Sequence, residues 1–299
     1  MTTTAVLTIV SGRHDHLRGQ LLGLRRSTSA PRWHVVASMG DPEVAAIVAD
    51  HPGHAGTETV VLDVPVGPDG ELPLARARNA AAAEAVRRGA ELLVLLDVDC
   101  VPAPGTLQAY ERAARDPAVL AAQGPTLLCG TVGYLPPGVL VQDPADVDGL
   151  AAAAGPHPAR PNPEPGRVVA AGEGQWWLFW SLSFATTAAD WQRFGGFCEE
   201  FCGYGGEDTD VAATVRSLGG SLFWVGGADA FHQHHPTQNP PTQHLAAILR
   251  NVKVFQERWG WFPMQGWLEQ FRERGLVDYD AATATWSPVA SECRPSARV

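Results

Sequence analysis

The sequence predicts an α/β protein with a mostly parallel sheet flanked by helices, and two observations predict it. Strand-like apolar segments alternate with helical segments over about the first hundred residues, an order that produces right-handed βαβ units. The run Leu92–Leu96 contains only branched aliphatic residues, which is typical of a strand buried on both faces of a parallel sheet. We expect the other elements to be arranged around this strand.

The first third of the chain supplies the remaining elements of this sheet. β-Branched, alternating residues and leucines at helical spacing mark the two kinds of element. The expected strands are 5–10, 33–38, 60–64 and 92–96. The expected helices lie around 17–24 and at 42–49 and 74–88, the second of them opened by Asp41 as its cap. Each of the first three strands is therefore followed by a helix.

Two acids, Asp97 and Asp99, end the Leu92 strand, with only Val98 between them. Ligands of open α/β sheets bind at the carboxyl ends of the strands. An Asp-x-Asp there can present oxygens to Mg²⁺ or Mn²⁺, while the other face of the metal takes phosphate oxygens. A polar turn is the alternative, because Asp is also a common turn residue.

The loops after the first two strands face the same edge of the sheet. They nominate Ser11, Arg13 and Asp15 after the first strand and Asp41 after the second as ligand-binding residues. Arg13 could meet a diphosphate, and a carboxylate could accept the N3–H of a uracil ring. Asp41 could instead serve only as a helix cap.

Three polar residues, Arg76, Arg78 and Asn79, open the Ala-rich helix expected at 74–88. A helix dipole disfavours cations at the amino-terminal turn, so we expect at least one arginine to have an anionic partner. We choose Arg76 as the donor-binding residue. An exposed arginine is the alternative.

The chain is acidic and has no clear targeting segment. Its formal net charge of −10 and pI near 5.4 argue against a nucleic-acid surface, which needs clustered Lys and Arg. The five cysteines are widely spaced, and Cys198 and Cys202 lack the two-pair spacing of a zinc site. We expect free thiols, no signal peptide, no membrane span and a cytoplasmic location.

The middle of the chain is irregular. A helix is expected at 104–114 and a strand at 119–123, followed by a Pro-, Gly- and Ala-rich connection over 124–174 that should hold no long regular element. Residues 175–186 then read as a strand with three tryptophans near its start. One of them, Trp177, could stack on a sugar ring or simply pack in the core.

The segment Gly205-Gly206-Glu207-Asp208 is the most specific in the chain. Val211, Val215 and Leu218 follow at helical spacing, which places Glu207 and Asp208 on the first turn of a helix. The helix dipole stabilises negative charge there, and an ionised carboxylate in a cleft can accept a proton from an attacking hydroxyl. A simple helix start is the alternative.

Three histidines in four positions, His232, His234 and His235, follow a short strand expected at 222–225. Imidazole completes Mn²⁺ sites, so these residues are candidate metal ligands. We choose His232 first and His234 second, with a simple surface loop as the alternative. Helices are expected at 245–259 and 264–274, and a loose tail from Asp280.

Taken together, these motifs resemble metal-dependent GT-A glycosyltransferases of the family 2 type and the related beta-1,4-galactosyltransferases. Residues 194–210, which end in Gly205-Gly206-Glu207-Asp208-Thr209-Asp210, are similar to the carboxyl-terminal catalytic segment of these enzymes. The Asp97-Val98-Asp99 run resembles their Asp-x-Asp motif, and the opening strand and helix resemble theirs. The resemblance implies a Rossmann-like GT-A fold with a smaller acceptor-side region, a nucleotide-sugar donor and a divalent metal.

The resemblance also implies a role for each motif residue. It makes Asp208 the catalytic base and Glu207 its acceptor-binding partner, and it makes Asp99 and a late histidine the metal ligands. Asp97 would hold the donor ribose or a water on the metal, beside Val98. The acceptor-binding residues would be Trp177, Tyr204 and Gly206. Tyr204 replaces a tryptophan and Thr209 an acid of the galactosyltransferases, so acceptor identity does not transfer.

We therefore predict a glycosyltransferase with Mn²⁺ or Mg²⁺ as its cofactor. It would move a hexose from a nucleoside-diphosphate sugar, with UDP favoured, to a saccharide or other hydroxyl acceptor. Asp208 favours an inverting reaction, because retaining relatives have Asn after the Glu. We expect one catalytic domain over 1–279, with a nucleotide-binding half (1–123), an acceptor half (124–279) and a tail (280–299). A nucleotidyltransferase and a sugar-nucleotide-binding protein without turnover are the alternatives.

Overall fold

The computed structural model describes residues 2–67 and 70–289, and these form two compact units. The first unit comprises the chain up to Glu199 together with Glu207–His235. The second comprises Glu200–Gly206 and the chain from Pro236 onward. The single catalytic domain expected over 1–279 stays a prediction.

The first unit is built on a mixed ten-stranded sheet, most of whose long strands are parallel. Eight strands follow the spatial order β3-β2-β1-β4-β9-β6-β10-β5, while β7 pairs with β6 and β8 with β10. The strands are β1 Thr4–Val10, β2 Trp33–Met39, β3 Glu58–Val64, β4 Leu92–Leu96, β5 Cys100–Pro102, β6 Thr126–Tyr134, β7 Gly155–Pro156, β8 Val168–Ala170, β9 Ser183–Thr187 and β10 Ser221–His232. The strands β1 to β4 are parallel to one another, and β6 is parallel to β10. The predicted α/β class with a mostly parallel sheet is confirmed.

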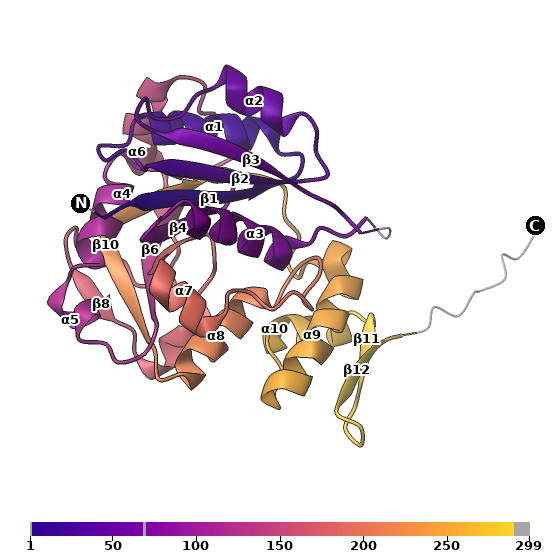
Figure 1. The fold of residues 1–299 in the computed structure, drawn as a ribbon. Coiled ribbons are helices and arrows are strands. Elements are labelled where there is room, and N and C mark those ends of the chain that lie inside the picture. Colours follow the sequence, from indigo (N-terminus) through magenta and orange to yellow (C-terminus); the bar gives the residue numbers. More distant parts are fainter. Residues whose placement is uncertain (1, 68–69, 290–299) are drawn as a thin grey trace, which may run out of the picture. The chain divides into compact units, whose positions relative to one another are not determined.

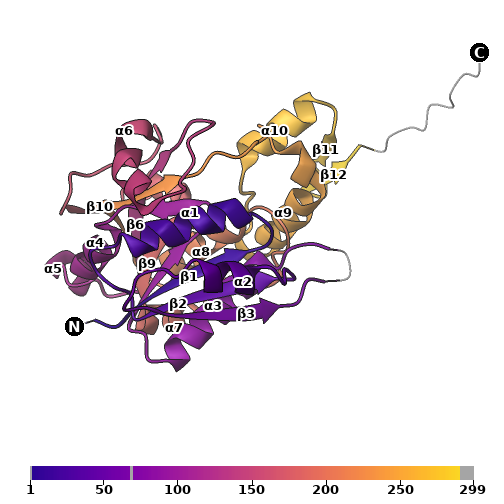
Figure 2. The ribbon, with the colours of Figure 1, turned by 90° about the horizontal axis from the view of Figure 1, so that it is seen from above.

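Helices cover both faces of this sheet, as Figures 1 and 2 show. Leu17 and Leu21 of α1 pack with Val10 and Val36, so the even-numbered residues of β1 and β2 face this side. Alanines of α3 pack on the opposite face, against Leu7 and its neighbours. One face carries α1 His14–Arg25, α2 Val44–Asp50 and α4 Thr106–Ala113, and the other carries α3 Leu74–Arg87, α7 Ala188–Phe194 and α8 Glu207–Ser217.

The Ala-rich composition of α3 explains how it packs. Alanine has the highest intrinsic helix propensity, and its small side chain lets a helix lie close to the sheet. Ala75, Ala82 and Ala85 are fully buried. Arg78 lies on the same face of the helix, since it follows Ala75 by three positions and precedes Ala82 by four. A charged side chain is therefore carried inward with the alanines.

Two expectations for the middle of the chain are wrong. The strand expected at 119–123 is a short helix, α5 Pro117–Leu120, because the Asp116 side chain accepts a hydrogen bond from the Ala118 N–H and Pro117 occupies the first helical position. The connection over 124–174 contains the nine-residue strand β6, besides two short helical turns, η1 Pro144–Gly149 and α6 Leu150–Ala153.

The strand expected over 175–186 is also wrong in its first half. Trp176 and Trp177 lie in a 3₁₀ turn, η2 Glu173–Leu178, Trp180 follows that turn, and only Ser183–Thr187 is a strand. The Gln175 side chain accepts hydrogen bonds from the Gly172 N–H and from the Trp224 indole, which fixes the turn. Two aromatic side chains on this segment, Trp176 and Phe179, are buried, so burial alone does not distinguish the turn from a strand.

The second unit is helical. It contains the short turn η3 Thr242–His244 and two helices, α9 Leu245–Trp259 and α10 Gln265–Glu273, and these two helices confirm the expected ones. A hairpin of β11 Val277–Asp280 and β12 Thr285–Pro288 follows. Its core includes Ile248, Leu268 and Phe271. The hairpin contradicts the loose tail expected from Asp280, and residues 290–299 of that tail lie outside the described residues.

Among the residues that the structure describes, no helix is long and apolar enough to cross a membrane. Cys100, Cys129 and Cys202 are free thiols, in agreement with the expectation from the spacing of the cysteines. Cys293 lies outside the described residues.

Gly130 in β6 provides a test of this packing. Its N–H donates to the Tyr110 hydroxyl at 2.9 Å, and an added Cβ would collide with that hydroxyl and with the Ala228 carbonyl. We expect Gly130→Ala to lower the free energy of unfolding by about 1–3 kcal/mol through overpacking. Denaturant unfolding measures it. The matched control is Gly149→Ala, where a Cβ meets nothing within 4 Å and φ is −90°; equal effects of the two substitutions would contradict the packing described.

Candidate active site

The candidate site lies where β4, β5 and β10 meet. Asp97 and Asp99 follow β4, and Cys100 begins β5. The antiparallel pairing of β10 with β5 sets His232 opposite Cys100, so the last residue of β10 lies beside Asp99. His232 is thus held by a strand, whereas the sequence placed it in a loop after a strand at 222–225.

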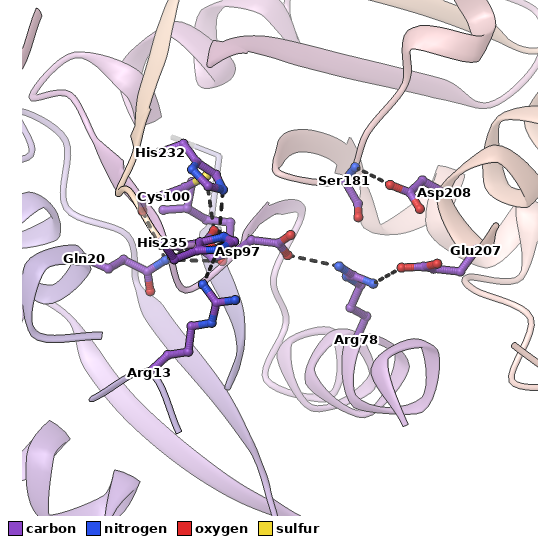
Figure 3. Close-up of polar contacts among 12 residues, drawn as sticks. Arg13, Gln20, Arg78, Asp97, Cys100, Ser181, Glu207, Asp208, His232 and His235 are labelled. Carbon is purple, nitrogen blue, oxygen red and sulfur yellow. Dashed lines mark hydrogen bonds and ion pairs between the residues drawn. The ribbon is translucent and has the colours of Figure 1, made fainter. Parts of the chain in front are cut away.

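Three nitrogen-containing side chains lie close to one carboxylate oxygen of Asp99. Asp99 Oδ2 lies 3.4 Å from His235 Nε2, 3.6 Å from His232 Nε2 and 3.2 Å from Arg13 Nη1. Figure 3 shows Arg13 and the two imidazoles pointing toward one place. The ligand atoms of Asp99, His232 and His235 lie within 4.8 Å of one another, so these three residues, named the cation cluster below, could hold one metal ion.

The expected second histidine, His234, is not in the cation cluster. It lines a cavity of about 800 Å³ together with Arg13, His14 and Asp15. The neighbouring His235 takes the place beside Asp99.

Burial and charge oppose each other within the cation cluster. Burial works to raise the pKa of Asp99, but the hydrogen bond with His235 and the nearby charges of His232 and Arg13 hold it below its ordinary value. Burial lowers the pKa of His232, although the Asp99 carboxylate works against it. Metal ions bind carboxylates in the ionised form and imidazoles in the neutral form, so the shifts of Asp99 and His232 both favour metal binding.

A single buried arginine connects the two acidic motifs. Arg78 Nη2 donates to Asp97 Oδ1 at 3.1 Å, and Arg78 Nη1 donates to Glu207 Oε1 at 3.3 Å, while the Arg78 side chain is 6% exposed. Figure 3 shows this bridge. The carboxylates of Asp97, Glu207 and Asp208 all raise the pKa of Arg78, against the effect of burial. The motifs at 97–99 and 207–208 therefore share one electrostatic environment.

Burial and the neighbouring carboxylates raise the pKa of two of these acids. Burial raises the pKa of Asp97 to about 6, with contributions from Asp99 and Asp208 and an opposing one from Arg78. Burial and the Asp208 charge raise the pKa of Glu207 to about 7, again against Arg78. Glu207 Oε2 is buried without a hydrogen-bond partner among the described residues. Glu207 is consequently a group that carries a proton for part of the time near neutral pH.

Asp208 lies on the first turn of α8, where the sequence placed it. Its Oδ2 accepts a hydrogen bond from the Ser181 N–H at 3.2 Å, shown in Figure 3. The helix begins directly after Gly205 and Gly206, whose φ angles of +98° and +97° are strained for any residue with a Cβ. The two glycines thus allow the sharp entry that presents both acids at the amino end of the helix.

The expected donor-side residues have different surroundings. Asp41 accepts hydrogen bonds from the Gly12 N–H at 2.7 Å and from His14 Nε2 at 2.8 Å. Burial opposes these bonds, but together they lower the pKa of Asp41. Asp15 is exposed and pairs with Arg18, and Ser11 is half-buried in the bend after β1.

Two further donor-side expectations differ in detail from the structure. Arg76 is exposed, and Arg78 is the arginine at the site. Val98 is buried in the core with Val10 and Leu17, and its role in donor binding stays a prediction.

The expected acceptor residues do not all lie in the first unit. Trp177 is 37% exposed, and the Arg216 guanidinium lies 5.5 Å from its ring. Tyr204 and Gly206 belong to the second unit, where Tyr204 stacks on His244 with ring centroids 4.7 Å apart. The acceptor roles of these residues stay predictions.

Sequence reasoning did not name Ser181, and it considered Arg78 and His235 but chose Arg76, His232 and His234 instead. A signal for Arg78 existed, because it shares the helical spacing of the buried alanines. No comparable signal marks Ser181, which acts through its backbone N–H, or distinguishes His235 from His234, because that depends on the path of the chain after β10.

The arrangement of strands and helices resembles solved glycosyltransferase structures. Residues 1–349 of TarS from S. aureus, in complex with UDP-GlcNAc, match with a TM-score of 0.55 and 10% identity, covering 92% of this chain and 78% of that one. The mannosyltransferase PcManGT from Pyrobaculum calidifontis, in complex with GDP-Man and Mn²⁺, matches with a TM-score of 0.54 and 17% identity, covering 87% and 66%. The fold is that of GT-A-type glycosyltransferases.

Local sequence similarity falls on the second motif of this GT-A fold. A family profile described as the N-terminal domain of galactosyltransferase matches residues 172–236, which include Asp208 and His232. Validoxylamine A glucosyltransferase from Streptomyces hygroscopicus is 43% identical over 44 residues, 15% of this chain. The matched residues span about a tenth of that relative (10%).

The raised pKa of Glu207 predicts a pH dependence of stability. Between the ordinary pKa of 4.5 and about 7, the folded state holds a proton that the unfolded state releases, so the free energy of unfolding falls as pH rises. We expect Glu207→Gln to flatten this fall by up to about 1.4 kcal/mol per pH unit. The raised pKa of Asp97 also makes the free energy of unfolding fall as pH rises, in the wild type and in Glu207→Gln alike.

Denaturant unfolding from pH 5 to 8 measures this difference in slope. The control is Glu200→Gln, which removes an exposed carboxylate and should leave the slope as it is in the wild type. A wild-type slope in Glu207→Gln would contradict the raised pKa.

Proposed function

We propose that this chain is a metal-dependent glycosyltransferase that moves a hexose from a nucleoside-diphosphate sugar, with UDP favoured, to a hydroxyl acceptor with inversion. The observation that carries the proposal is the Arg78 bridge. It links Asp97, two residues before the Asp99 ligand of the cation cluster, to Glu207, the neighbour of the candidate base Asp208. The similarity of residues 172–236 to the galactosyltransferase profile supports the same function.

The cation cluster fits a divalent metal. One carboxylate and two imidazoles, from Asp99, His232 and His235, form a mixed oxygen and nitrogen donor set, which suits Mn²⁺ better than Mg²⁺. When bound, such an ion would neutralise charge that develops on the departing nucleoside diphosphate. The structurally similar PcManGT is in complex with GDP-Man and Mn²⁺, which supports the assignment by analogy of fold alone.

The donor-side residues would bind and orient the nucleotide. Arg13 lies 3.2 Å from Asp99, so its guanidinium can reach a diphosphate beside the cation cluster. The Asp41 carboxylate, fixed by Gly12 and His14, would accept a hydrogen bond from the base. Asp97 is held by Arg78 and would hydrogen-bond the ribose. Ser11 would contact the nucleotide from the bend after β1.

Asp208 would act as the general base. The hydrogen bond from the Ser181 N–H fixes the orientation of its carboxylate. The carboxylate would take the proton from the acceptor hydroxyl as that oxygen attacks the anomeric carbon, in a single displacement that inverts the configuration. Glu207, whose pKa is about 7, can donate or accept a hydrogen bond and would hold a second group of the acceptor.

A screen of nucleotide sugars tests the proposal as a whole. Selective donor binding should raise the melting temperature, and more so with Mn²⁺, because a ligand that binds only the folded state stabilises it by mass action. NMR of the product should then show the opposite anomeric configuration to the donor. Donor binding without transfer or hydrolysis, over a broad set of acceptors, would favour a binding protein.

Substitution of the base should separate binding from turnover. We expect Asp208→Asn to bind the nucleotide-sugar donor within about twofold of the wild type while turnover falls by about 10² or more, the scale of lost general-base help. Calorimetry and product assays measure the two quantities. The exposed variant Glu200→Gln should keep wild-type turnover. Turnover in Asp208→Asn similar to the wild type would remove this residue from the base role.

The two adjacent histidines offer a direct test of the cation cluster. We expect His235→Ala to weaken Mn²⁺ binding about tenfold or more, because it removes one of three ligands. His234→Ala is the matched control and should leave the Mn²⁺ affinity within about twofold, because His234 lines the neighbouring cavity instead. Titration calorimetry of Mn²⁺ into each variant measures this. The opposite ranking would move the metal site to His234.

A further inference from the structure

Two buried glutamines lie against the backbone of the cation cluster. Gln20 on α1 is fully buried, and Gln233, between His232 and His235, is 7% exposed. Both donate hydrogen bonds to backbone carbonyl groups, which suggests that they hold the chain segments from which the ligands project.

Gln20 holds the turn that carries Asp99. Its Nε2 donates to the Asp97 carbonyl at 2.7 Å, with the Leu96 and Cys100 carbonyls each at 3.3 Å. These carbonyls come from the end of β4 and the start of β5, on both sides of Asp99. Figure 3 shows Gln20 beside Asp97 and Cys100. One side-chain amide therefore fixes the backbone before and after the carboxylate ligand.

A chain of hydrogen bonds through Thr8 and His34 fixes the orientation of the Gln20 amide. Its Oε1 accepts a hydrogen bond from the Thr8 hydroxyl at 2.8 Å, and that hydroxyl lies 3.1 Å from His34 Nε2. Because the Thr8 proton goes to Gln20, Thr8 accepts from His34, which requires the proton on Nε2. Burial lowers the pKa of His34 to about 4, so this neutral form persists at neutral pH. The chain of donors turns the Gln20 NH₂ toward the carbonyls.

Gln233 holds the two histidine ligands. Its backbone N–H donates to the Asp99 carbonyl at 2.7 Å, and its side-chain Nε2 donates to the His16 carbonyl at 3.0 Å. The side chain lies against Gly19 of α1, where an added Cβ would collide with Gln233 Oε1. The absence of a side chain at Gly19 is thus what makes room for this contact.

We propose that Gln20 and Gln233 are positioning residues that set the divalent-cation affinity of the Asp99, His232 and His235 cluster. Gln20 fixes the Asp99 turn and Gln233 fixes the histidine segment, both against α1. This inference rests on the metal site of the proposed function. Outer residues that orient metal ligands are typically worth 10- to 100-fold in metal affinity.

The test uses Gln20→Met and Gln233→Met, which keep side-chain length and remove the amide. Each variant should bind Mn²⁺ about 10- to 100-fold more weakly than the wild type by titration calorimetry, at a temperature where all proteins are folded. Gln175→Met is the matched control. It also removes side-chain hydrogen bonds, to Gly172 and Trp224, but at a distance in sequence and structure from the cation cluster. We expect it to lower the melting temperature and leave the Mn²⁺ affinity unchanged.

A second measurement separates positioning from a loss of packing. Gly19→Ala should displace the Gln233 side chain and weaken Mn²⁺ binding while every ligand and both glutamines remain. In the Gln233→Ala background the space beside Gly19 is empty, so Gly19→Ala should weaken Mn²⁺ binding little further. Additive losses would overturn the coupling between Gly19 and Gln233.

The outcomes distinguish this inference from the proposed function. If the wild type does not bind Mn²⁺ or Mg²⁺, the metal part of the proposed function fails. If the wild type binds Mn²⁺ and both glutamine variants bind it equally well, the inference fails while the proposed function stands. Equal weakening by Gln175→Met would also overturn it, because that result indicates a general loss of stability.

Discussion

The pairing of Arg78 with both acidic motifs is the interaction on which the rest of the site depends. A buried guanidinium is costly unless its charge is matched, and removal of one partner of such a pair typically costs about 3–5 kcal/mol. Asp97 and Glu207 supply the match from segments more than a hundred residues apart. The same pairing stabilises the ionised forms of the two buried carboxyl groups, since Arg78 lowers the pKa of each against the effect of burial. Each motif is consequently part of the environment that the other requires.

The sheet topology then determines which residues complete the site. β10 runs parallel to β6 and antiparallel to β5, so its last residue, His232, arrives opposite Cys100 and next to Asp99. His235 follows three residues later and reaches the same oxygen. On the other face of the sheet, α3 carries Arg78 inward among its alanines. The acids of the cation cluster and the arginine bridge lie in local sequence motifs, but strand register and helix packing bring them together with the histidines and with Arg78.

This explains how much of the molecule could be predicted from the sequence. The strands and helices up to residue 96, the helix start at Glu207 and the Asp97-Val98-Asp99 turn are local patterns, and the structure confirms them with one exception. The helix expected at 42–49 begins at Val44 with Glu43 and not Asp41 at its cap position, because Asp41 accepts a hydrogen bond from the Glu43 N–H in the turn before the helix. The choice of Arg76 over Arg78 stays a prediction. It considered the charge at a helix start and not the helical face, and so gave no weight to the arginine that the structure pairs with Asp97 and Glu207. The strand expected at 175–186 is wrong because buried aromatics occur equally in a 3₁₀ turn. His235 depends on the chain path after β10, which no local pattern encodes.

The start of α1 illustrates what the site requires of the backbone. Arg13 precedes the helix with φ at +52°, directly after Gly12 at +59°. A left-handed conformation costs a residue with a Cβ roughly 1–2 kcal/mol, and glycine would avoid this cost. The Arg13 side chain, however, makes an ion pair with Asp99 at 3.2 Å, and α1 continues from it to Gly19 and Gln20. The strained turn thus places the Arg13 side chain beside the cation cluster. The helix that begins there carries Gln20 and Gly19, which contact the segments that hold the metal ligands. One short segment therefore connects backbone strain, the geometry of the ligands and the proposed diphosphate contact.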